Sequence, residues 1–277
     1  MKESRLRYQL SGFINTPSLF LNNLYTGIQP FHLIPDTNLE IREILSKIEF
    51  PVKLVMGKRM EFFFKAAIIF NPQLQLLANN IQIHQNKITL GELDYLVNDL
   101  QSQKILHIEL MYKIYVYDPN IQTEMKRWIG PNRKDSLIEK LDKVKNKQLP
   151  LLYSIPARPF LKTLEISAEN IEQQICYKAK LFIPKHLEGQ DFPYVNNKCI
   201  AGYYYNLQQF IEEFQDNDQF YAPEKQDWPS HPESNTNWVS YKKIIKEIRI
   251  IHLKKKAPLI WIQKNSGEYE STLVVWW

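Results

Sequence analysis

The sequence predicts a mixed α/β fold in which one helix is followed by three strands and a second helix. Apolar residues between positions 58 and 70 recur every three or four residues, which is the spacing of a buried helical stripe. The segments 76–84, 88–99 and 104–117 are predicted to be strands, and only short polar breaks separate them. Breaks of that length favour antiparallel hairpins, so we expect a β-meander.

The second helix of this core is predicted by its capping residues and its apolar face. Ser136 and Glu139 have the spacing of a capping box, which marks the beginning of a helix. Leu137, Leu141 and Val144 then give this helix one apolar side. The predicted order of elements is therefore helix, three strands, helix.

The flanking segments are predicted to add further elements to this core. Three prolines within the first fifty residues favour a short helix, a loop and a second helix over 41–48. We divide the chain into an N-terminal helical segment (1–50), the core (51–150) and a C-terminal region (151–277) that packs on the core or extends it. In that region we expect a strand at 178–183, a helix at 207–214, a polar loop at 216–237, a basic segment at 238–256 and a final strand at 273–277.

The composition indicates an ordered protein of the cytoplasm. A chain of 277 residues with 44% hydrophobic content can bury a large core. Cys176 and Cys199 belong to no zinc motif and to no disulfide framework of the secreted kind, so we expect reduced thiols. The sequence lacks the apolar segment of a signal peptide, and no stretch approaches the ~20 apolar residues of a membrane span. We therefore expect no membrane association.

The charge distribution weakly favours a polyanionic partner. The formal net charge is +5 and the pI is about 8.9. Basic residues gather at 133–147 and again at 242–256, where they could neutralise the phosphates of a nucleic acid. Acidic residues interrupt both segments, so two solvated faces are an equally good interpretation. The charge permits nucleic acid as a partner without requiring it.

The third predicted strand carries charged residues on a side that we expect to be buried. Side chains alternate across a strand, so the even positions from Leu106 to Val116 form one apolar face. His107, Glu109 and Lys113 share the opposite face. Ionic groups on a largely buried strand need partners, because an unpaired buried charge costs several kcal/mol or more.

The preceding strand offers a second carboxylate at the matching place. Asp94 and Glu92 lie on one face of that strand, and Asp94 can face Glu109 across the sheet. Two such carboxylates repel each other, which a protein relieves by sharing a proton or by recruiting a cation. Oxygen ligands near a lysine suit Mg²⁺ or Mn²⁺ better than zinc.

The order of these residues resembles a known superfamily of phosphodiesterases. Glu61 on the first helix, Asp94 on the second strand, and Glu109 with Lys113 on the third are similar to the αβββα core of the PD-(D/E)XK nuclease superfamily. The resemblance covers residues 57–148. It implies a restriction-endonuclease-like core with a mixed sheet, to which the C-terminal region adds further α/β elements.

The sequence also resembles a bacterial family of uncharacterised proteins that is linked to this superfamily. This second resemblance extends over most of the chain. The similar stretches are Gly57–Glu61, Gly91–Asp94, His107–Leu110 with Lys113, Trp128–Pro131 and Gln148–Pro150.

The resemblance to the superfamily implies phosphodiester cleavage that depends on Mg²⁺ or Mn²⁺. Asp94 and Glu109 would be metal ligands and Glu61 an auxiliary ligand, while Lys113 would orient the water or stabilise developing charge. Gln148 matches the position of a glutamine that lies near the metal in some branches of the superfamily.

The spacing of the lysine departs from the superfamily pattern. The lysine usually follows the glutamate by two residues, and Met111 stands there in this chain. Four residues of strand span ~13 Å, so Lys113 reaches the metal only if its side chain leans back or the strand bulges.

Two other functional interpretations stay open. The first is a non-catalytic nucleic-acid-binding or scaffold protein that keeps the nuclease fold. The second is a structural network of ion pairs among Asp94, Glu109 and Lys113, without any ligand. His107 could contact a phosphate or be a satisfied structural histidine, and Glu92 is a spare carboxylate.

Overall fold

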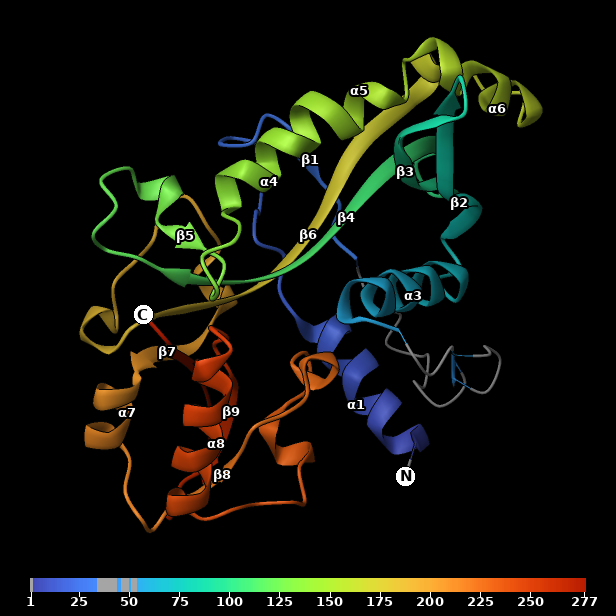
Figure 1. The fold of residues 1–277 in the computed structure, drawn as a ribbon. Helices are drawn as coiled ribbons and strands as arrows, with labels where there is room; N and C mark the ends of the chain where they lie inside the picture. The colour runs from blue at the N-terminus through green and yellow to red at the C-terminus, as the bar shows by residue number, and fades with distance from the viewer. Residues whose placement is uncertain (1, 34–43, 46–49, 51–53) are drawn as a thin grey trace. The chain divides into compact units, whose positions relative to one another are not determined.

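A computed structural model describes residues 2–33, 44–45, 50 and 54–277. It confirms a mixed α/β fold with several helices and a large mixed sheet (Figure 1). By their internal contacts the residues form two compact units. The meander unit comprises Ser18–Tyr112 and Glu139–Lys178, and the C-terminal unit comprises Met1–Pro17, Lys113–Ile138 and Ala179–Trp277. The predicted segments 1–50, 51–150 and 151–277 divide the chain by sequence rather than by contacts, and they stay a prediction.

The meander unit contains all three strands that the sequence predicts for the core. β2 pairs with β3 and β3 pairs with β4, in both cases antiparallel. β6 follows β4 in the strand order, and the short β1 pairs in parallel with β6. The long strands β4 and β6 continue into the C-terminal unit. The bounds of these strands are β1 (Gln29–Pro30), β2 (Leu74–Gln85), β3 (Ile88–Asp99), β4 (Lys104–Tyr117) and β6 (Ile171–Pro184).

The register of the meander depends on its two turns and on two shifts in the β2–β3 pairing, at Leu76/Ala78 and at Ile83/His84. Asn86 and Lys87 connect β2 to β3 with φ of 49° and 66°, and such a pair of left-handed residues matches the twist of a two-residue hairpin. At the next turn the Asp99 carboxylate accepts hydrogen bonds from the backbone of Gln101 and Ser102. Asp99 therefore pairs with Lys104 at the base of the second hairpin.

The helices of the meander unit cover apolar side chains of its strands. α3 buries Met60, Phe63 and Phe64, as its helical spacing predicts. The helix predicted after Ser136 begins as expected but contains a π-helical turn over residues 144–148. An apolar cluster joins the segment around Leu152 and Leu161 to β2 and β3. The helices are α3 (Met56–Ile69), α4 (Leu137–Lys143), α5 (Leu149–Leu151) and α6 (Arg158–Thr163).

The C-terminal unit continues the sheet in the order β6-β7-β10-β9-β8, and β5 pairs with β4. The pairs β6–β7 and β7–β10 are parallel, whereas β10–β9 and β9–β8 are antiparallel. The sheet is therefore mixed, as expected. Its remaining strands are β5 (Trp128–Ile129), β7 (Ile200–Asn206), β8 (Gln219–Tyr221), β9 (Leu259–Gln263) and β10 (Tyr269–Val275).

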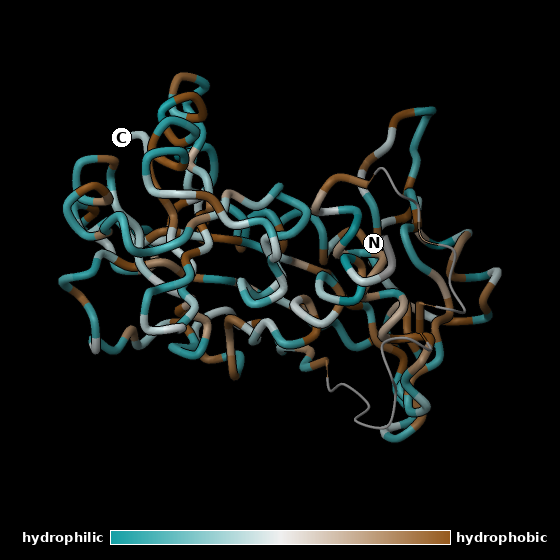
Figure 2. The backbone as a smooth tube through the Cα atoms, turned by 90° about the horizontal axis from the view of Figure 1, so that it is seen from below, coloured by the Kyte–Doolittle hydropathy of each residue, from teal (hydrophilic) through white to brown (hydrophobic). Residues whose placement is uncertain are grey.

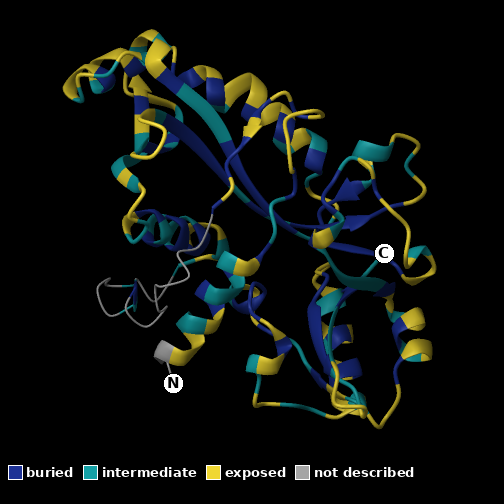
Figure 3. Cartoon of the chain, turned by 180° about the vertical axis from the view of Figure 1, so that it is seen from behind, coloured by how far each residue is buried: buried dark blue, intermediate teal, exposed yellow. Residues whose placement is uncertain are grey.

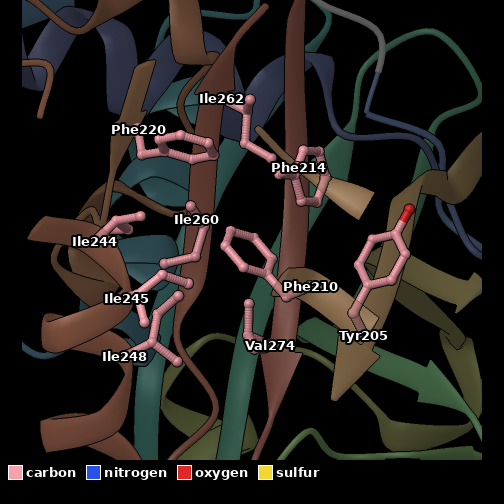
Figure 4. Close-up of a cluster of buried hydrophobic side chains, with 10 residues drawn as sticks. All are labelled: Tyr205, Phe210, Phe214, Phe220, Ile244, Ile245, Ile248, Ile260, Ile262 and Val274. Carbon is pink, nitrogen blue, oxygen red and sulfur yellow. The ribbon is translucent and has the colours of Figure 1, made fainter. Parts of the chain in front are cut away.

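An aromatic and isoleucine-rich core stabilises the C-terminal unit (Figure 4). Phe210 and Phe214 pack edge to face or tilted against Phe220 and against each other. Ile244 and Ile248 approach them from the buried face of α8. The helices of this unit are α1 (Lys2–Asn15), α7 (Leu207–Glu213) and α8 (Tyr241–Leu253).

The structure corrects two details of the predicted C-terminal region. The segment 216–237 is not entirely loop, because it contains β8, whose Phe220 is buried in the core. The last strand begins earlier than predicted, at Tyr269, and ends at Val275. The predicted strand at 178–183 lies within β6, and the predicted helix at 207–214 corresponds to α7. The helical pattern at 41–48 falls largely outside the described residues.

Burial differs between the strands, the helices and the loops. β4, β6 and β9 are mostly buried, β2 is largely half-buried or exposed, and many loop residues and outward helix faces are exposed (Figure 3). Hydrophobic and hydrophilic residues alternate along the backbone (Figure 2). Among the described residues, no helix has the length and apolar character needed to cross a membrane.

Candidate functional site

The two predicted carboxylates lie where the pairing of β3 and β4 ends. The ladder runs from Asp99 opposite Lys104 to Tyr95 opposite Ile108. Beyond this pair, the backbone N–H of Leu110 donates a hydrogen bond of 2.9 Å to Oδ2 of the Asp94 side chain instead of to a backbone carbonyl oxygen of β3. This side chain therefore lies at the opening between the strands, one step from Glu109.

Glu109 is fully buried and is held by two side chains. Its Oε1 lies 3.0 Å from Nε2 of His107, which is also fully buried. Its Oε2 accepts a hydrogen bond from the amide of Gln148 in the π-helical turn. Both oxygens of Glu109 thus have a neighbouring nitrogen, which favours the ionised carboxylate.

A glutamine on β6 determines which nitrogen of His107 carries the proton. The amide nitrogen of Gln173 donates to the carbonyl oxygen of Leu149 at 2.7 Å, so that atom is the nitrogen and not the oxygen of the amide. The same nitrogen lies 3.0 Å from Nδ1 of His107. Nδ1 therefore accepts, Nε2 carries the hydrogen, and the imidazole donates to Glu109. Burial lowers the pKa of His107 to about 4, so the ring is neutral at pH 7.

Burial and mutual repulsion make the two carboxylic acids unusually weak. Loss of hydration raises the pKa of Asp94, and the charge of Glu109 raises it further. Loss of hydration also raises the pKa of Glu109. Asp94 accepts one hydrogen bond from the backbone, whereas Glu109 has two donors, so we assign the negative charge of the pair to Glu109 and the retained proton to Asp94.

A second carboxylate cluster is built around Asn80 in the same unit. The amide of Asn80 donates to Glu61 at 3.0 Å and to Glu92 at 2.6 Å. Lys58 lies 2.7 Å from Glu61 and 3.7 Å from Glu92. Asn80 has a φ of 53° within β2, a left-handed conformation that is uncommon in a strand and that often occurs at functional sites. Glu61 and Glu92 both raise the pKa of Asp94.

Lys113 has a different local environment. Its ammonium lies 3.3 Å from the carboxylate of Asp135, and both residues belong to the C-terminal unit. It is four residues along β4 from Glu109, as the sequence requires. The predicted role of Lys113 in charge stabilisation stays a prediction, with Asp135 as its partner in this structure.

Three features of the site go beyond the sequence prediction. Asn80 gives no signal beyond being a polar residue in a strand, and Gln173 is remote from His107 in the sequence. The π-helical turn that presents Gln148 has no marker in the sequence, although such turns are frequent at functional sites.

The oxygen atoms at this site are of the kind that binds a hard divalent cation. Carboxylates of Asp94 and Glu109 are oxygen donors, and the Oε1 atom of Gln148 is buried without a hydrogen-bond partner. In the part of the chain that the structure describes, no three His, Cys, Asp or Glu side chains are already arranged to hold a metal ion. A cation would therefore need Gln148 or water to complete its coordination.

Comparison with known proteins places the chain in a family. No curated protein and no solved structure matches it, and the family match carries no link to the PD-(D/E)XK superfamily. The family model for a domain of unknown function, DUF1853, matches residues 29–272, which is most of the chain. The chain therefore belongs to the DUF1853 family.

Proposed function

We propose that this protein is a divalent-metal-dependent phosphodiesterase that acts on nucleic acid, with Asp94 and Glu109 at its centre. One observation carries the proposal: a half-buried carboxylate, Asp94, and a fully buried one, Glu109, lie at the end of a strand pair, and both have raised pKa values. A purely structural ion-pair network would give each carboxylate a cationic partner. In the described part of the chain, the hydrogen-bonding partners of Asp94 and Glu109 are instead neutral, namely a backbone N–H, an imidazole and an amide.

The proposed ligands are oxygen donors of the meander unit. Asp94 and Glu109 would hold Mg²⁺ or Mn²⁺, Gln148 would contribute its buried oxygen, and Glu61 would be an auxiliary ligand. The bound cation would supply a Lewis acid and lower the pKa of a coordinated water. His107 keeps Glu109 oriented and ionised, and Lys58 compensates the charge of Glu61.

The likeness to the PD-(D/E)XK core supports the nuclease assignment at the level of element order. α3, β2, β3 and β4 follow one another as a helix and three strands, and α4 comes after the short strand β5. In our proposal this segment is a restriction-endonuclease-like core, and the protein acts in the cytoplasm, where its two free cysteines would stay reduced. Arg133 and the lysines of 134–147 would attract the polyanionic substrate.

The alternative is a non-catalytic nucleic-acid-binding or scaffold protein with the same fold. The pairing of Lys113 with Asp135 favours it, because this lysine is then neutralised by a neighbour instead of by a substrate. Such a protein would bind nucleic acid without metal, and Asp94→Asn would leave that binding unchanged.

Cleavage assays distinguish these two functions. Single-stranded and double-stranded DNA and RNA are incubated with Mg²⁺ or Mn²⁺ and the wild-type protein, Glu109→Gln or Glu172→Gln. Glu172 is a matched control, since it is a carboxylate on β6 that pairs with Lys104 at the surface. We expect cleavage by wild type and by the control, and a loss of about 100-fold or more in Glu109→Gln. Metal-independent binding without cleavage by wild type would instead support the alternative.

A further inference from the structure

The C-terminal unit contains a groove that is separate from the carboxylate pair. Its volume is about 540 Å³, within the range of small-molecule sites. α1, β6 and β10 line it together with the segments around Lys198 and Pro229. Every lining residue belongs to this one unit, so the groove is complete within it.

Lys180 of β6 supplies a positive charge to the groove wall. Its ammonium donates to the carbonyl oxygens of Trp228 at 2.9 Å and Pro229 at 3.0 Å. Among the described residues, no carboxylate pairs with this ammonium, which leaves one of its three N–H groups for another acceptor. Burial lowers the pKa of Lys180 to about 8, which leaves the amine mostly protonated at pH 7.

The rest of the lining adds a second cation and several hydroxyl groups. Lys198 is exposed and, within the described chain, has no carboxylate partner. Ser11 and Ser230 contribute hydroxyls. Glu270 is the carboxylate of the lining, and Lys264 neutralises it at 3.2 Å. The groove therefore presents a net positive charge and hydrogen-bond donors.

The segment that Lys180 contacts also has other anchors. Gly12 of α1 already packs so closely that an added Cβ would lie 2.2 Å from the carbonyl oxygen of Pro229. Trp228 is anchored as well, because its indole N–H donates to the carbonyl oxygen of Pro223 at 3.2 Å. Lys180 is therefore one of several residues that hold this segment in place.

We propose that this groove binds the phosphate group of a small phosphate monoester through Lys180, Lys198 and the neighbouring hydroxyls. A phosphate accepts hydrogen bonds from several directions, which suits two lysines and hydroxyl donors. A carboxylate ligand would be better matched by a planar arginine fork, and the lining contains no arginine. The site is independent of the carboxylate pair in the meander unit.

Isothermal titration calorimetry with three probes tests this site. The probes are inorganic phosphate, ribose 5-phosphate and ribose, and the proteins are wild type, Lys198→Gln, Lys180→Met and Lys255→Gln. Lys198 and Lys255 are both exposed, so their substitution preserves the fold, and Lys255 lies outside the groove. We expect both phosphates to bind wild type and Lys255→Gln, with ribose 5-phosphate at least as tight as inorganic phosphate.

The variants give the decisive comparison. Affinity for ribose 5-phosphate should fall about tenfold or more in Lys198→Gln and at least as far in Lys180→Met, since each removes a charge-assisted hydrogen bond. Equal affinity in wild type and Lys198→Gln would overturn the proposal, and so would equal binding of ribose or a wild type that binds neither phosphate. Lys198→Gln keeps the test valid even if Lys180→Met fails to fold.

Discussion

Nδ1 of His107 accepts a hydrogen bond from Gln173, and this makes the other ring nitrogen a donor to Glu109. Three elements thus cooperate to fix one carboxylate: β6 supplies Gln173, β4 supplies His107 and Glu109, and the π-helical turn supplies Gln148. A buried carboxylate whose donors are fixed in this way stays ionised while its neighbour Asp94 keeps a proton. That asymmetry suits a site that binds a cation in exchange for a proton.

We predict that His107→Phe destabilises the protein by about 1–3 kcal/mol, because a buried carboxylate loses one of its two donors. The pKa of Glu109 should rise further, since the ionised form loses a hydrogen bond. Urea unfolding at pH 7 measures the first effect, and carboxyl ¹³C NMR measures the second. His84→Phe is the control, because His84 is exposed and should leave both quantities unchanged. An unshifted Glu109 in His107→Phe would contradict the hydrogen-bond assignment.

We also predict that the metal-free protein becomes less stable as the pH rises from about 6.5 to about 8. Asp94 holds the proton of the pair with a raised pKa in the folded state, so the stability from this protonation is fully present below the unfolded pKa near 4 and is lost as the pH approaches about 8. One retained proton corresponds to a slope of about 1.4 kcal/mol per pH unit. Asp94→Asn should flatten this slope in urea titrations.

The window for that measurement is set by two other buried groups. The lowered pKa of His107, about 4, makes stability increase with pH up to about 6.5, where the unfolded histidine loses its proton. The lowered pKa of Lys180, about 8, makes stability increase with pH above about 8, where the folded lysine loses its proton before the unfolded one. Between these limits the carboxylate pair dominates, and an equal slope in wild type and Asp94→Asn would refute its assignment.

Mn²⁺ should stabilise wild type and remove much of this pH dependence, because the cation replaces the proton that Asp94 retains. At a metal concentration of a hundred times the Kd the gain is about 2.7 kcal/mol, which for this chain length raises the Tm by several degrees. Glu109→Gln should lose the shift in differential scanning calorimetry, and Glu172→Gln should retain it. A wild type that does not respond to Mn²⁺ or Mg²⁺ would exclude the metal site.

Much of the fold could be predicted because local patterns determine it. The alternation along β4 and the helical spacing of Met60, Phe63 and Phe64 depend only on residues close in sequence. Local patterns do not predict the π-helical turn at 144–148 or the short edge strand β8, because both depend on residues that are distant in the sequence. Phe220 joins the sheet because a buried position beside β9 is available to it, and this is a tertiary effect.

The candidate site could be predicted only where the register brings its members together. Asp94 and Glu109 follow from two adjacent antiparallel strands with a short turn between them. Gln173 reaches His107 from β6, across 66 residues of sequence, and no local pattern marks it. For Lys113 the sequence predicts the strand and the face on which it lies, but not its partner. That partner, Asp135, lies in a loop whose path the sequence does not determine.

The turn at Asn86 and Lys87 allows the backbone strain at Lys87 to be tested. Lys87 has a φ of 66°, a left-handed conformation that costs a residue with a Cβ roughly 1–2 kcal/mol. Lys87→Gly should therefore raise the free energy of unfolding by about 1 kcal/mol, because Asn-Gly is the preferred pair for this turn. Lys87→Ala keeps the Cβ and should change stability little, and urea unfolding compares the two. If glycine were no better than alanine, the left-handed conformation of Lys87 would not be a source of strain in this turn.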